Sequence, residues 1–290
     1  MRFAEIGQQL RAYRLESGLR AEEIAARLGV SRAALYRYEK GEVIKLDTVK
    51  RLGELLKVSP LSLLGIGVEY YSRSVGFFER LRQVEETADQ ILQAYGATFY
   101  LATSDAFDAA LADALAGAST VPGVDTAAFR TNADQVLGIL AARKRSYLQR
   151  RPGVIAILSP GTIQTFLQHG ALADARLPDT LRARCRRAAH TEMRNIAELM
   201  ETEPMGLQFG LATAETTASF GILRTRDRAT LAVNPFLVDG LPTAQSGVAM
   251  ITGADEAVAS HQRVAEAMWR DAMKGPEAAA RLRAMLDSAG

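Results

Sequence analysis

Cysteine is almost absent from this 290-residue chain, which contains only Cys185. An intramolecular disulfide is therefore excluded, and a chain of this length can bury enough apolar surface to fold without one. The sequence also lacks an uninterrupted apolar run near the ~20 residues that a membrane-spanning helix needs. Its first residues, MRFAEIGQQLR, are charged and lack the apolar stretch of a signal peptide. We expect a soluble, cytoplasmic protein of about two domains with no membrane partner.

Familiar catalytic motifs are missing as well. The chain has no G-x-S-x-G, no P-loop, no C-x-x-C and no H-E-x-x-H. Its three histidines lie far apart, and the spacing of Cys185, His190 and Glu192 puts these residues on different faces of one predicted helix. An enzyme fused to a DNA-binding domain remains an alternative only if catalytic residues that are distant in sequence come together in the folded protein. We expect no catalytic activity, no metal and no cofactor.

Charge is distributed unevenly although the net charge is only +2. Residues 1–64 contain 12 lysines and arginines against 8 acidic residues, whereas the remainder contains 23 basic and 25 acidic residues. A basic N-terminal segment on a mildly acidic body is typical of a protein that binds nucleic-acid phosphates through one domain.

Apolar residues at three- and four-residue spacing predict five short helices in the N-terminal segment. Gly18, Gly29 and Gly41 follow three of them, as helix-ending glycines do, and Pro60 stands where a helix begins. The predicted helices cover residues 4–17, 21–28, 32–40, 46–56 and 60–64.

The second and third predicted helices, with the turn between them, have the spacing of a helix-turn-helix. Gly29 lies in the turn, Val30 fills the corner, and Ser31 stands at the position of an N-cap.

The run GLRAEEIAARLGVSRAALYRYEKGE resembles the Xre/Cro/C1 repressor-like family of transcriptional regulators. The resemblance covers residues 6–64 and implies a five-helix domain, a homodimer on double-stranded operator DNA, and the third helix in the major groove. Arg20 departs from the family, which often has Ser, Thr or Asn at this N-cap.

Helix geometry selects the residues of the third helix that face DNA. With Leu35 and Tyr38 inward, the outward face can offer arginines to guanine and small or aromatic groups to thymine methyls, while the helix ends can meet phosphates. The alternative is that these side chains are merely solvated. The predicted DNA contacts are Arg32, Ala33, Tyr36 and Arg37 for bases and Ala21, Ser31, Lys40 and Lys45 for phosphates.

Arg14 and Glu39 match a pair that joins the first and third helices in the resembled family. The resemblance implies a partly buried ion pair that sets the orientation of the recognition helix and reads no base.

Residues 65–95 are predicted to connect the two domains. Residues 65–76 contain glycine and serine without periodicity, which suggests a hinge. Residues 77–95 are predicted as a helix that packs either on its own domain or in a dimer seam. Its apolar positions are Phe77, Leu81, Val84, Ala88, Ile91 and Tyr95.

Residues 96–290 are predicted as a mixed α/β domain for sensing or dimerisation, with an antiparallel meander over 207–233 and some parallel pairing before it. The predicted strands are 98–102, 154–158, 207–212, 218–225, 229–233 and 248–252, and the predicted helices are 105–116, 132–149, 161–169, 180–201, 255–274 and 276–288.

Two basic clusters lie on the predicted helices of this domain. Such runs are usually a solvated face, but a pocket for a small anionic effector is the alternative. The candidate effector-binding residues are Arg143, Arg145, Arg182 and Arg186.

The favoured interpretation is a one-component regulator in which a dimeric body senses a small molecule or a protein partner. An alternative is an antitoxin or phage-immunity protein that regulates its own gene and binds a protein partner through its C-terminal domain.

Overall fold

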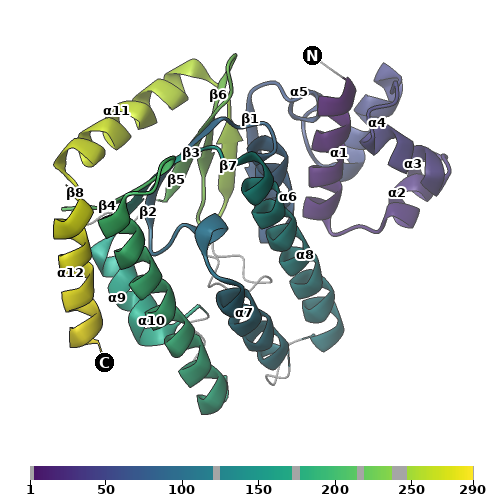
Figure 1. Ribbon diagram of the computed structural model, residues 1–290. Helices are drawn as coiled ribbons and strands as arrows, with labels where there is room; N and C mark the ends of the chain where they lie inside the picture. The colour runs from purple at the N-terminus through teal and green to yellow at the C-terminus, as the bar shows by residue number, and fades with distance from the viewer. Residues whose placement is uncertain (1–2, 120–124, 172–176, 214–218, 237–246, 290) are drawn as a thin grey trace.

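The protein is described by a computed structural model that covers residues 3–119, 125–171, 177–213, 219–236 and 247–289. The first predicted residue of the 218–225 strand lies outside these ranges. Five helices are followed by a mixed α/β body with an eight-stranded sheet (Figure 1), which confirms the predicted fold class. No helix among the described residues is both long and apolar enough to cross a membrane.

The five N-terminal helices form at the predicted positions. Gly18, Gly29 and Gly41 adopt φ values of 70°, 70° and 93°, a left-handed conformation that ends or turns the chain at little cost only for glycine. Leu10, Tyr13, Ile24, Leu35 and Leu52 form the buried centre of this bundle. The helices are α1 (Phe3–Ser17), α2 (Ala21–Leu28), α3 (Arg32–Glu39), α4 (Leu46–Leu56) and α5 (Pro60–Leu63).

The predicted connector has a different structure over much of its length. Within the predicted hinge, β1 (Val68–Tyr71) is the edge strand of the sheet and pairs antiparallel with β7 (Ala249–Thr252). The connector helix is α6 (Ser74–Glu85), and β2 (Gln90–Gly96) is a central strand. The expected helix over 77–95 is therefore wrong after residue 85. Residues 91 and 95 fit a heptad, but the backbone of β2 pairs along both of its edges, with β3 on one side and β5 on the other.

The sheet has the order β1-β7-β6-β5-β2-β3-β4-β8. Strands β2, β3 and β4 run parallel, whereas β1, β7, β6 and β5 pair antiparallel. The predicted meander over 207–233 is therefore wrong for β4, which pairs in parallel with β3. The antiparallel meander is instead β5–β6–β7, and β1 extends it at the edge of the sheet. The predicted strand 98–102 is replaced by a 3-10 turn over Tyr100–Ala102. The remaining strands are β3 (Gly153–Leu158), β4 (Leu207–Leu211), β5 (Phe220–Arg224), β6 (Ala229–Val233) and β8 (Met273–Lys274).

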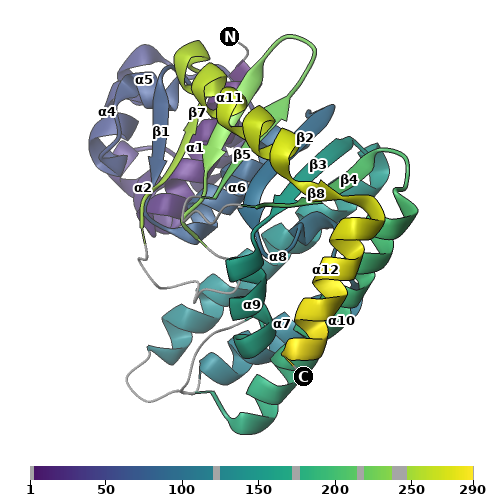
Figure 2. The same ribbon diagram turned by 90° about the vertical axis from the view of Figure 1, so that its left-hand side faces the viewer.

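Helices cover the two faces of the sheet unequally (Figures 1 and 2). α11 crosses one face, where it packs on β5 and β6. The opposite face supports the larger core, with α9 on β2 and α10 and α12 on β4. The body helices are α7 (Asp105–Ala118), α8 (Thr126–Arg150), α9 (Pro160–His169), α10 (Asp179–Thr202), α11 (Asp255–Asp271) and α12 (Gly275–Ser288).

The N-terminal bundle packs directly on the body through α1 and α6. Gly76, in the first turn of α6, lies against Glu16, so that a β-carbon on Gly76 would lie 2.8 Å from Cβ and 3.0 Å from Cα of Glu16. Next to this contact, Tyr13 of α1 stacks on Tyr71 of β1 with ring centroids 5.4 Å apart. Only glycine at position 76 lets α1 and α6 approach this closely.

Polar contacts fix the same junction. The carboxylate of Glu16 accepts hydrogen bonds from the backbone amides of Ser72 (2.7 Å) and Arg73 (3.1 Å), which lie at the start of α6. Buried Glu69 of β1 accepts from Gln9 of α1 at 2.6 Å and from Arg80 of α6 at 2.9 and 3.0 Å. A buried carboxylate with this many donors is costly to separate from them, so residues 65–76 do not form the predicted hinge.

We predict that Gly76→Ala destabilises the protein, by about 1–3 kcal/mol, because the methyl group must push α1 away from α6. Urea unfolding of the full chain, with hydrogen exchange in residues 3–17, measures the effect. Gly138→Ala on α8 is the matched control, since nothing lies within 4 Å of the added methyl group. It should stabilise the helix by up to ~1 kcal/mol. Equal effects of the two substitutions would contradict the tight α1–α6 contact.

Candidate DNA-binding interface

The turn between α2 and α3 is built from backbone hydrogen bonds. The amide of Val30 donates to the carbonyl of Ala25 at 3.0 Å, and the amide of Gly29 donates to Ala26 at 3.2 Å. These two bonds satisfy the last carbonyls of α2 in the Schellman pattern, which needs a left-handed residue where Gly29 stands. The turn therefore holds α3 at a fixed angle to α2.

The two helices begin differently. Oγ of Ser31 accepts a hydrogen bond from the amide of Ala34 at 3.1 Å, which confirms Ser31 as the N-cap of α3. At the start of α2, the amide of Arg20 donates to the carboxylate of Glu23 at 2.9 Å. Glu23 thus supplies the reciprocal half of a capping box at the position where Arg20 departs from the resembled family.

The solvent face of α3 contains the side chains predicted to read bases. Arg32, Ala33 and Arg37 are exposed and Tyr36 is half-buried, whereas Leu35 is fully buried. Arg32 lies over the ring of Tyr36, 5.3 Å from its centroid, and donates to its hydroxyl at 3.2 Å. This hydroxyl and the charge of Glu22 raise the pKa of Arg32, so the group is a permanent cation.

Each arginine of this face already has a carboxylate partner. Arg32 lies 2.7 Å from Glu22 of α2, and Arg37 lies 3.0 Å from Glu42 after α3. All four side chains are more than half exposed, and exposed ion pairs of this kind contribute only about 0–1 kcal/mol. The arginines can therefore leave these carboxylates at small cost. Neither acidic partner is predicted from the sequence, although the spacing of Glu42 from Arg37 places Glu42 just past the helix end.

The residues predicted for phosphates lie at helix ends around this face. Lys40, Lys45 and Ser31 are exposed. Ala21 is buried, so its contribution is confined to its backbone amide at the start of α2.

Arg14 and Glu39 connect α1 to the end of α3. Nε of Arg14 lies 2.5 Å from Oε1 of Glu39 and Nη2 lies 3.2 Å from Oε2, a two-pronged contact. Burial alone would lower the pKa of Arg14. The hydrogen bond to Glu39 and the negative charge of that carboxylate outweigh burial, so the pKa of Arg14 is raised. A β-carbon on nearby Gly7 would lie 2.5 Å from the carbonyl of Tyr38, so α1 lies directly against the C-terminal end of α3.

Comparison with known proteins agrees with this geometry. Residues 5–64 match a family model described as a helix-turn-helix domain. These residues form a helix-turn-helix domain. A protein of Pyrococcus horikoshii, provisionally named an HTH-type transcriptional regulatory protein, is 44% identical over 62 residues, which are 20% of this chain and 20% of that protein. The chain thus matches about a fifth of the length of this relative.

The structure does not bring the four candidate effector-binding arginines together. Arg143 is buried and bonded to Glu85, and Arg145 is exposed. Arg182 lies beside Asp179 on α10, and Arg186 lines an open hollow on the same helix with His190 and Arg194. The two clusters therefore lie in separate parts of the body and do not form one shared pocket, and the hollow beside Arg186 is lined only by residues of the second cluster and its neighbours on α10 and near the C-terminus.

Cys185, His190 and Glu192 form no metal-binding group among the described residues. Glu192 instead accepts hydrogen bonds from the backbone and the hydroxyl of Ser104, the N-cap of α7. Cys185 is buried, and burial raises the pKa of its thiol. Both residues are explained by packing of α10 against its neighbours.

We predict that Arg14→Leu lowers the free energy of unfolding by about 3 kcal/mol, because it leaves the carboxylate of Glu39 buried without a partner. Urea denaturation of the full chain measures the loss. Glu42→Gln, which removes an exposed pair, should change the stability by less than about 1 kcal/mol. The double variant Arg14→Leu, Glu39→Gln should recover part of the lost free energy of unfolding, because it removes the unpaired buried charge. A double variant as unstable as Arg14→Leu alone would contradict the role of the ion pair in holding α3.

Proposed function

We propose that this protein is a sequence-specific, one-component transcriptional regulator that binds double-stranded operator DNA through α3. The observation that carries the proposal is the exposed face of α3, where Arg32 and Arg37 stand on a helix held rigidly by the turn at Gly29 and by the Arg14–Glu39 pair. Such a helix fits the major groove, and a guanidinium can bind O6 and N7 of guanine with two hydrogen bonds.

The proposal also assigns the regulator to the Xre/Cro/C1 type, acting in the cytoplasm as a homodimer on two half-sites. The resemblance of residues 6–64 supports this assignment, as does the name of the relative from Pyrococcus horikoshii. In the proposal the α/β body senses an effector and catalyses no reaction. A dimer predicts half-sites whose centres lie one helical turn, or a multiple of it, apart.

The test begins with operators selected from random duplex DNA by the full-length protein. Arg37→Ala should weaken binding to the selected operator about 5- to 150-fold, corresponding to about 1–3 kcal/mol, and should relax the preference at one base position in each half-site. A fluorescence titration at fixed salt, repeated with operators substituted at each position, measures both effects.

Arg263→Ala provides the control, because Arg263 is an exposed arginine on α11 in the body. It should change neither the affinity nor the base preference. Unchanged affinity and unchanged base preference for Arg37→Ala would overturn the role of α3. A selected operator with a single half-site would overturn the dimer.

A further inference from the structure

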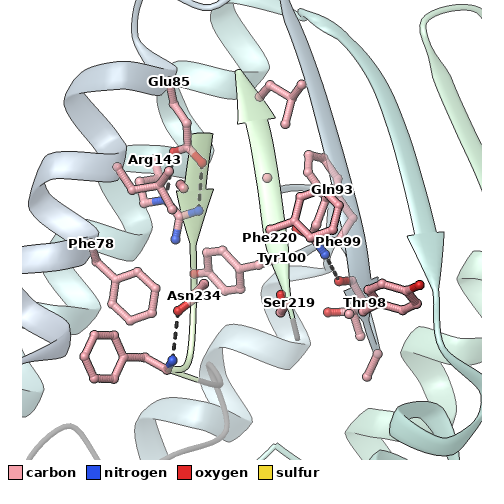
Figure 3. A pocket seen from close by; sticks show the side chains of 18 of the residues that line it. Phe78, Glu85, Gln93, Thr98, Phe99, Tyr100, Arg143, Ser219, Phe220 and Asn234 are labelled. Atoms are coloured by element: carbon pink, nitrogen blue, oxygen red, sulfur yellow. Dashed lines mark hydrogen bonds and ion pairs between the residues drawn. The ribbon is translucent and has the colours of Figure 1, made fainter. Parts of the chain in front are cut away.

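A cavity of about 120 Å³ lies in the body between α6, α8 and the sheet strands β2, β5 and β6. Figure 3 shows that side chains from these elements converge on it. It lies on the face of the sheet opposite α11, among the larger core. The helix-turn-helix match does not account for this space, and of the four candidate effector-binding arginines only Arg143 lines it.

Aromatic rings from several elements line the cavity. Phe77 and Phe78 come from α6, Phe99 and Tyr100 follow β2, Phe107 and Phe166 come from α7 and α9, and Phe236 follows β6. Closed apolar cavities of ~150 Å³ take up benzene from water. This cavity is somewhat smaller but partly open to its surroundings. It can therefore hold one ring, with a short substituent at the open side.

One ion pair stands in this apolar wall. Arg143 of α8 donates from Nε and Nη2 to the two carboxylate oxygens of Glu85 of α6, both at 2.8 Å, and each side chain is 7% exposed. The guanidinium carbon lies 5.4 Å from the ring centre of Phe78 and 5.7 Å from that of Tyr100. In Figure 3 the third guanidinium nitrogen points away from Glu85, toward the space between Phe78 and Tyr100.

The charge of this pair determines which ligand it can accept. Arg143 and Glu85 together are neutral, so a second carboxylate would enter an apolar space without a cation of its own, beside an existing anion. Burying such an uncompensated charge is far more costly than burying a neutral group that accepts a hydrogen bond. The free edge of the guanidinium therefore favours a carbonyl or similar neutral oxygen.

We propose that this cavity is a binding site for an uncharged single-ring compound whose oxygen accepts a hydrogen bond from Arg143. Its role as an effector site rests on the proposed function, whereas binding itself is measured without DNA. This ligand class replaces the anionic effector suggested by the arginine clusters.

α6 connects the site to the helix-turn-helix domain. Phe77, Phe78 and Glu85 of α6 line the cavity, while Gly76 and Glu79 face α1, with Glu79 2.8 Å from Arg11. A ligand in the cavity thus contacts the helix on which the DNA-binding domain rests, without an intervening element.

The experiment titrates full-length protein with acetophenone, a neutral ketone on one ring, by isothermal calorimetry. Gly221→Val fills the cavity from β5; its first added carbon meets only ordinary contacts, at 3.5 Å from the carbonyl of Leu92 and 4.0 Å from Leu223, so the fold should tolerate it. Ala229→Val on β6 is the matched control, because Ala229 belongs to the core beneath α11.

We expect one acetophenone per chain, at least tenfold weaker binding to Gly221→Val, wild-type binding to Ala229→Val, and benzoate at least tenfold weaker than acetophenone. Bound acetophenone should also slow hydrogen exchange in residues 74–85. The proposal is overturned if wild-type protein does not bind acetophenone, if Gly221→Val binds it equally, if benzoate binds as tightly, or if exchange in residues 74–85 is unchanged. Because no DNA is present, these outcomes are independent of the Arg37→Ala titration.

Discussion

The packing of α1 against the first turn of α6 determines where the recognition helix lies relative to the body. At this contact the absent side chain of Gly76 admits Glu16, and the carboxylate of Glu16 binds the amides at the start of α6. α1 in turn holds α3 through Arg14 and Glu39. The orientation of α3 is therefore set by a chain of packed helices, α6 to α1 to α3, and not by a flexible linker.

This arrangement constrains how a signal can reach DNA. Close-packed helices do not deform continuously, so a ligand in the proposed site would act by favouring one of a few discrete positions of α6. It can do so only to the extent that it binds one of those positions better than another. A shift of α6 would move the whole helix-turn-helix domain as a unit, since Glu69 and Arg80 connect β1 and α6 to α1 by buried polar contacts as well.

Local signals in the sequence were sufficient for the N-terminal domain, because glycines, an N-cap serine and helical periodicity all act within a few residues. They were insufficient for the connector, where the positions of Ile91 and Tyr95 suit both a heptad and a strand, and only the neighbours of β2 decide between them. The cavity had no local signal at all. Glu85 and Arg143 are 58 residues apart, so the sequence pattern places Arg143 in a basic cluster and gives no sign of its buried partner.

The carboxylates of Glu22 and Glu42 occupy the same guanidinium atoms that phosphates or guanines would use. Each acts as an internal competitor at high effective concentration. Random DNA offers isolated phosphates, which gain little by displacing a carboxylate, whereas a matched site offers two acceptors in the right plane for one arginine. If α3 binds DNA as proposed, the weak ion pairs of α3 lower the occupancy of non-operator DNA more than that of the operator, and they improve discrimination without a base contact of their own.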